Sequence, residues 1–145
     1  MYKNIVVATD GSDIAKGATA HAITLAKTTG AKITAVLVTE PYEAIAFTST
    51  MQVIDPLAYR ERCAAHASEV LSAVQADCEG QGVACATVHR DNHYPYDGII
   101  TAAQEADADL IVIGSHGRRG LEGLLIGSEA VKLLTHTKIP TLVVR

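Results

Sequence analysis

Apolar residues in this chain form short continuous runs separated by segments with helical spacing. The runs that predict buried strands lie at residues 5–8, 33–38, 83–89, 110–113 and 140–145. Between them, apolar side chains recur every three or four positions, which predicts helices over residues 12–30, 55–80, 95–106 and 128–136. Strands that alternate with helices indicate an α/β fold, in which a parallel sheet is covered by helices on both faces.

The ends of these elements carry local signals. Ser12 or Asp13 can cap the first helix, and Gly30 can end it. Asp55 reads as an N-cap with Pro56 at the first helical position, and Ala64 begins the buried face of that helix. The third strand is more polar than the others, which favours an edge position. Residues 39–54 show neither the apolar run of a buried strand nor the spacing of a helix, so we expect a lid or a mobile loop there.

Composition and charge narrow the class of protein. The length of 145 residues suits one domain, residues 1–145, and the single Phe and absent Trp suit helices on a parallel sheet. A net charge of −4 gives no reason to expect nucleic acid or an anionic membrane as a partner. No apolar run approaches 18 residues, and three cysteines without a CxxC pairing suit a reducing cytosol, so we expect a cytoplasmic protein. The cysteines are expected to be buried or half-buried small hydrophobic residues.

The stretch from Asp109 to Val131 is the best candidate site. Glycines stand at positions 114, 117, 120, 123 and 127, between a buried strand and the start of a helix. Glycine lets backbone N–H groups approach a ligand closely, and a helix N-terminus adds partial positive charge, so this stretch can bind an anion. If the first and fourth strands are neighbours, Asp10 and Gly114 face each other across one crevice at their carboxyl ends.

Two common phosphate motifs are excluded. A P-loop needs a Gly-Lys pair, which the chain lacks, and no GxGxxG turn follows the first or the fourth strand. The spacing that remains is Gly114-x2-Gly117-x9-Gly127-Ser128. Ser128 could donate its hydroxyl to a phosphate while also acting as the N-cap of the last helix. Arg118 and Arg119 bring positive charge, or are ordinary solvated side chains.

This spacing, with the opening IVVATDGS and the closing IPTLVV, resembles the ATP-binding branch of the universal stress protein family. The resemblance covers the whole chain. It implies a five-stranded parallel sheet of order 3-2-1-4-5 and a homodimer that pairs through the last strand, Thr141 to Arg145. It also implies a small cytoplasmic stress-response protein that binds ATP, often with Mg²⁺, and acts as a nucleotide-dependent regulator.

The resemblance also assigns site residues. It implies that Ala8, Thr9, Asp10 and Val38 line the adenosine end of the pocket. It implies that ribose and phosphates lie along Ile113, Gly114, His116, Gly117, Gly127 and Ser128. We also expect Arg118 to contact the ligand, through its positive charge. Duller interpretations stay open for some of them: Asp10 could only cap the first helix, and His116 is expected to offer backbone contacts rather than acid–base catalysis.

Glu129 departs from the family pattern, in which a small or apolar residue follows Gly-Ser. Its carboxylate in the first helical turn stabilises the helix by about 0.3–1 kcal/mol and competes with a phosphate for the same positive end. Alternatively, it helps to hold Mg²⁺, which accepts one or two carboxylates plus phosphate oxygens. A second departure is the loop 91–95, which has no glycine before Pro95.

Two other functions remain open at this point. One is a slow ATPase, for which Glu129 and His116 would be the first candidates for a catalytic residue. The chain has no Walker-type lysine and no evident water-positioning residue, which argues against efficient turnover. A nucleotide-free dimeric interaction module would explain the fold, but the retained glycine motif argues against it.

Overall fold

A computed structural model describes residues 1–46, 55–116 and 126–145 of the chain. The strands are β1 (Asn4–Ala8), β2 (Lys32–Thr39), β3 (Cys85–Asp91), β4 (Leu110–Gly114) and β5 (Thr141–Val144). The helices are α1 (Asp13–Thr29), α2 (Tyr42–Ala46), α3 (Pro56–Gly80), α4 (Pro95–Glu105) and α5 (Ser128–His136).

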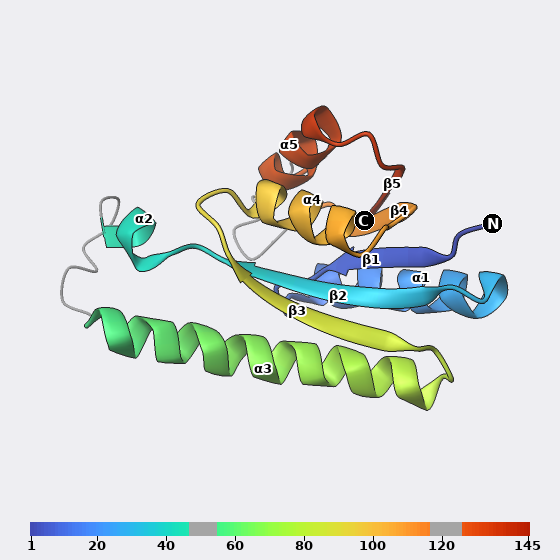
Figure 1. Cartoon of the computed structure of the whole chain (residues 1–145), viewed down its shortest axis with the longest axis horizontal. Coiled ribbons are helices and arrows are strands. Elements are labelled where there is room, and N and C mark those ends of the chain that lie inside the picture. Colours follow the sequence, from blue (N-terminus) through green and yellow to red (C-terminus); the bar gives the residue numbers. More distant parts are fainter. Residues whose placement is uncertain (47–54, 117–125) are drawn as a thin grey trace.

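The five strands form one parallel sheet with the order β3-β2-β1-β4-β5, as predicted. Helices α1 and α3 cover one face and α4 and α5 cover the other (Figure 1). The order in which strands are added reverses at β1. Strands β2 and β3 lie on one side of β1, and β4 and β5 lie on the other. This places the carboxyl ends of β1 and β4 next to each other, where ligands bind in such sheets.

Alternating side chains of the central strands divide the core into two layers. In β1, Ile5 and Val7 pack with α1 and α3, whereas Val6 and Ala8 pack with α4 and α5. Strand β4 repeats this division. Because both faces are buried, these strands carry no polar alternation, which is why the sequence shows them as continuous apolar runs.

Strand β3 occupies an edge, which confirms the interpretation of its polar pattern. It begins two residues later than predicted, because the N–H of Val83 bonds to the carbonyl of Cys78 and so belongs to the turn that ends α3. It also ends later, so that Arg90 and Asp91 pair with β2 rather than lying in a loop.

The expected loop at 39–54 contains the short helix α2, which the sequence pattern did not predict. The Tyr59 hydroxyl of α3 donates to the carbonyl of Glu40 at 2.6 Å, and the Tyr59 ring lies 5.8 Å from the ring of Tyr42. These contacts hold α2 against the start of α3, and burial raises the pKa of Tyr59 well above its ordinary value. Residues 47–54 lie outside the described part of the chain.

The helix ends agree with the sequence signals only in part. Ser12 caps α1 by accepting from the N–H of Ala15, and Gly30 ends α1 in the left-handed conformation with φ 76°. Asp55 occupies the N-cap position of α3, but its side chain makes no capping hydrogen bond. Ala64 is exposed; the prediction that it belongs to the buried face of α3 was wrong, since that face consists of Ala67, Leu71, Val74 and Cys78.

Cys78 is buried and Cys63 and Cys85 are partly buried, as expected. Burial raises the pKa of Cys78 to about 12, and the neighbouring thiol of Cys85 adds to the rise. Within the described ranges, no helix is both long enough and apolar enough to cross a membrane.

Candidate functional site

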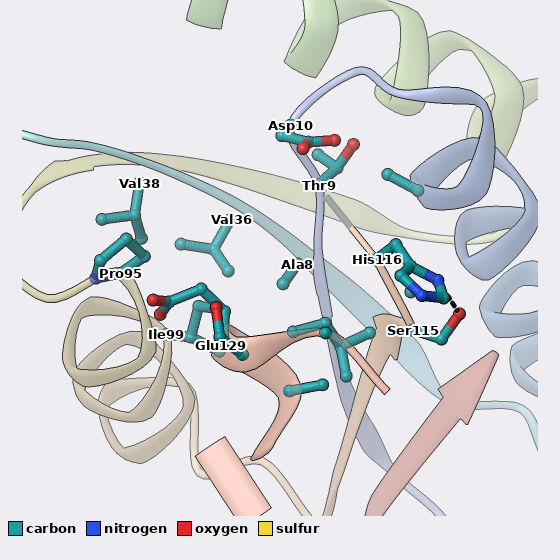
Figure 2. A pocket seen from close by; sticks show the side chains of 16 residues that line it. Ala8, Thr9, Asp10, Val36, Val38, Pro95, Ile99, Ser115, His116 and Glu129 are labelled. Carbon is teal, nitrogen blue, oxygen red and sulfur yellow. Dashed lines mark hydrogen bonds between the residues drawn. The ribbon is translucent and has the colours of Figure 1, made fainter. Parts of the chain in front are cut away.

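A cavity of about 310 Å³ opens at the carboxyl ends of β1, β2 and β4. The first turns of α1, α4 and α5 complete its wall (Figure 2). It is lined by Ala8, Thr9, Asp10, Ala15, Val36, Val38, Pro95, Ile99, Ile113, Gly114, Ser115, His116, Gly127, Ser128, Glu129 and Ala130. Its volume falls in the range of small-molecule sites, about 300–1,000 Å³.

The cavity brings together ten of the twelve residues assigned from the sequence. These are Ala8, Thr9, Asp10, Val38, Ile113, Gly114, His116, Gly127, Ser128 and Glu129. The remaining two, Gly117 and Arg118, lie outside the described residues. Asp10 and Gly114 face the same cavity, as expected from the pairing of β1 with β4.

The loop that leaves β1 is held by its own side chains. Asp10 Oδ1 accepts from the N–H of Ser12 at 2.9 Å, and Thr9 Oγ1 accepts from the N–H of Gly11 at 3.2 Å. The N–H of Thr9 continues the sheet by donating to the carbonyl of Val36 at 2.9 Å. Asp10 does not cap α1, because Ser12 occupies the N-cap position; its side chain instead holds the turn before the helix, and it also lines the cavity.

The strand exit after β4 forms the opposite wall. Ser115 is buried, and its N–H donates to the carbonyl of Val144 at 2.6 Å, which extends the pairing with β5. Its hydroxyl lies 2.9 Å from Nδ1 of His116 (Figure 2). These bonds hold the backbone at Gly114 to His116 in one position along the edge of the cavity.

Helix α5 begins at this wall in a way that corrects the sequence interpretation. Gly127, not Ser128, occupies the N-cap position, and no side chain caps the helix. The N–H of Gly127 donates to the carbonyl of Ser115, and a Cβ at position 127 would lie only 2.6 Å from that oxygen. Glycine is thus required here by the close approach of the chain's own backbone, and the Ser128 hydroxyl is left for another partner.

The other end of the cavity is apolar. Val36 and Val38 lie on the same side of β2, and Pro95 and Ile99 come from the first turns of α4 (Figure 2). Val36, Pro95, Ile99, Ala15, Ser115 and Ala130 were not assigned from the sequence. Val36 could have been found, because residues two apart on a strand share a face. Ile99 could not, because its place depends on how α4 packs on the sheet.

Glu129 lies between the two ends. Its Oε2 accepts from the N–H of Tyr96 in the first turn of α4 at 3.1 Å, and its Oε1 accepts from Nζ of Lys132 at 3.3 Å. In Figure 2 the Glu129 carboxylate points toward Pro95 and away from His116. The carboxylate therefore joins the starts of two helices at the rim of the cavity.

The described residues include no group of three or more His, Cys, Asp or Glu side chains that could hold a metal ion. The carboxylates that line the cavity, from Asp10 and Glu129, both accept hydrogen bonds from backbone N–H groups. The donor set in the described part of the chain therefore does not amount to a protein-built Mg²⁺ site, because a bound ion would need most of its ligands from elsewhere.

Comparison with known proteins now decides the family. The sequence profile described as the Universal stress protein family matches residues 1–145. The chain belongs to this family. A universal stress protein of Methanocaldococcus jannaschii, MJ0531, is 34% identical over all of this chain and 83% of its own length. YxiE of Bacillus subtilis, another universal stress protein, is 29% identical over the full length of both chains.

Solved structures show the same fold. The universal stress protein UspA of Lactobacillus plantarum superposes with a TM-score of 0.82 and 26% identity, covering 99% of this chain and 98% of that one. A universal stress protein in complex with cAMP superposes with a TM-score of 0.73 at 24% identity, covering 99% and 97%. A third, from Archaeoglobus fulgidus, is in complex with dAMP and has a TM-score of 0.70 at 24% identity, covering 99% and 98%.

Proposed function

We propose that this stress protein binds an adenine nucleotide in the cavity at the carboxyl ends of β1 and β4, with ATP as its ligand. The observation that carries the proposal is the division of the cavity. The apolar end, with Val36, Val38 and Ile99, suits a nucleotide base. The polar end suits phosphates, because the backbone at Gly114 and the N-terminus of α5 lie there together. Complexes of two proteins of the same fold with cAMP and dAMP give the reason to choose adenine.

In this proposal the bound nucleotide regulates what the protein contacts in the cytoplasm, rather than fuelling rapid turnover. The Gly114-x2-Gly117-x9-Gly127-Ser128 spacing is the sequence feature that supports ATP as the ligand within this proposal. Mg²⁺ would be held mainly by the phosphates of ATP and by water, because the described residues offer no cage for it.

Ser128 allows a clean test. Its hydroxyl makes no capping bond in α5, so Ser128→Ala is expected to leave the Tm unchanged. If the hydroxyl donates to a phosphate, the same change weakens ATP binding by about tenfold, which is typical for the loss of one hydrogen bond to a charged group. Isothermal titration calorimetry with ATP, with and without Mg²⁺, measures the Kd of both proteins.

Ser12→Ala is the matched control. Ser12 is a true N-cap outside the cavity, so its loss lowers stability by about 0.5–2 kcal/mol and leaves the Kd for ATP unchanged. If the wild-type chain binds no adenine nucleotide at millimolar concentration, the proposed function is wrong. Release of ADP during prolonged incubation with ATP would instead favour the second candidate, a slow ATPase.

Pairing of two copies through β5 is the second part of the proposal. This strand is the last in the sheet, and Leu142 and Val143 are only partly buried. An edge strand with apolar side chains is a template for a second copy. Light scattering at tens of micromolar protein is expected to give the mass of a dimer, and the mass of a monomer would contradict this part.

A further inference from the structure

The carboxylate of Glu129 is anchored at the rim of the cavity by two helices. Helix α4 has Tyr94 at its N-cap position, without a side-chain capping bond, and α5 likewise begins without one. Glu129 supplies an acceptor to α4 through the N–H of Tyr96 and stands in the first turn of α5. Both helices present partial positive charge at these ends, which favours a carboxylate in this position.

This anchoring means that the carboxylate stays in place when an anion enters. Turning it away would leave the Tyr96 N–H without the partner that it has in this structure. Its ion pair with Lys132 is only a partial neutralisation, because the two side chains are 49% and 38% exposed and solvent screens their attraction.

The described lining of the cavity is otherwise poor in positive charge. Its formally charged members are Asp10 and Glu129, and none of the sixteen described lining residues is Lys or Arg. The Glu129 carboxylate points toward Pro95, but the residue stands in the first turn of α5, so phosphates at the start of this helix bring further negative charge into a cavity that already holds a fixed one. The repulsion grows with each phosphate, whereas an uncharged nucleoside does not experience it.

We propose that Glu129 is a specificity-determining residue that disfavours each added phosphate charge on the nucleotide. The inference rests on the proposed function, because it concerns the ligand of the same cavity. Glu129→Gln isolates the charge, since the amide oxygen of Gln can still accept from the Tyr96 N–H. Lys132→Gln is its counterpart, because it removes the positive partner and leaves the charge of the carboxylate uncompensated.

The experiment measures the Kd of adenosine, AMP, ADP and ATP by calorimetry in EDTA, at low and high salt, for the wild-type chain and both variants. For Glu129→Gln we expect no change with adenosine, about threefold tighter binding of AMP and about tenfold tighter binding of ATP. For Lys132→Gln we expect the opposite effect: no change with adenosine, weaker binding of AMP and a larger loss with ATP. Both effects should shrink at high salt, because added ions screen the charges.

Two outcomes would overturn the inference. One is an equal change for adenosine and ATP, which would mean that Glu129 acts only by shaping the cavity. The other is an ATP affinity that neither variant alters. Failure of the proposed function looks different, because the wild-type chain would then bind none of the four ligands. If Glu129→Gln unfolds, Lys132→Gln alone still decides, since it leaves the cap of α4 intact.

Discussion

The close approach of α5 to the exit of β4 predicts that Gly127→Ala destabilises the protein before any ligand is considered. A Cβ at position 127 would lie 2.6 Å from the carbonyl oxygen of Ser115 and 3.3 Å from Cα of His116. Ordinary contact begins at about 3.4 Å, so the two backbone segments must separate by about 0.8 Å. Both groups are backbone, and the Gly127 N–H is bonded to the same oxygen, so a change of side-chain rotamer cannot relieve the contact.

The magnitude follows from two opposing terms. Forcing a methyl group into such a contact costs about 1–3 kcal/mol. Replacing Gly by Ala restricts the unfolded chain and returns about 0.4–1 kcal/mol, because φ −68° and ψ 154° at position 127 are open to alanine. The net loss is about 1.5 kcal/mol. An unfolding entropy of about 2.1 cal/mol/K per residue over 145 residues converts this to a fall in Tm of about 5 °C.

Differential scanning calorimetry of the ligand-free protein measures this shift. Gly17→Ala is the matched control, because Gly17 lies inside α1 and a Cβ there meets nothing within 4 Å. That change should raise stability by about 0.5–1 kcal/mol. A Gly127→Ala protein that melts at or above the wild-type temperature would refute the reasoning. The glycine would then be free of packing demands, and a ligand would be the better explanation for it.

Two further predictions concern the other side of the sheet. Gly11→Ala should cost more stability than Gly82→Ala: both positions have positive φ, 82° and 73°, but only a Cβ at Gly11 meets a neighbour, Val70 Cγ2 at 2.8 Å. We expect about 2–3 kcal/mol against about 1–2 kcal/mol in denaturant unfolding, and equal losses would contradict the packing argument. Burial raises the pKa of Cys78 to about 12, so the folded state favours its protonated thiol, and this contribution is lost as the pH rises above the ordinary thiol value. The free energy of unfolding should therefore fall between about pH 9 and 12, with a shallower fall in Cys78→Ala; identical slopes would exclude this thiol as a cause.

Local signals in the sequence determined the elements and much of the sheet. Continuous apolar runs predicted β1 and β4 as strands buried on both faces, and the polar run predicted β3 at an edge. Ser12 and Gly30 end α1 as expected. These features depend on residues close together in the chain, where side-chain period and capping chemistry act directly. The order of the strands came from family resemblance, and the structure confirms it.

Only the tertiary structure decided which atoms meet at the cavity. The sequence could suggest Ser128 as a cap, but the residue before α5 lies beside the exit of β4, so the carbonyl of Ser115 takes the N–H of Gly127. Glu129 could be seen as an anomaly, but its partner Tyr96 is 33 residues away in the chain. Which acceptor satisfies a helix end depends on the segments that folding brings beside it, and the periodicity of a single segment carries no information about that.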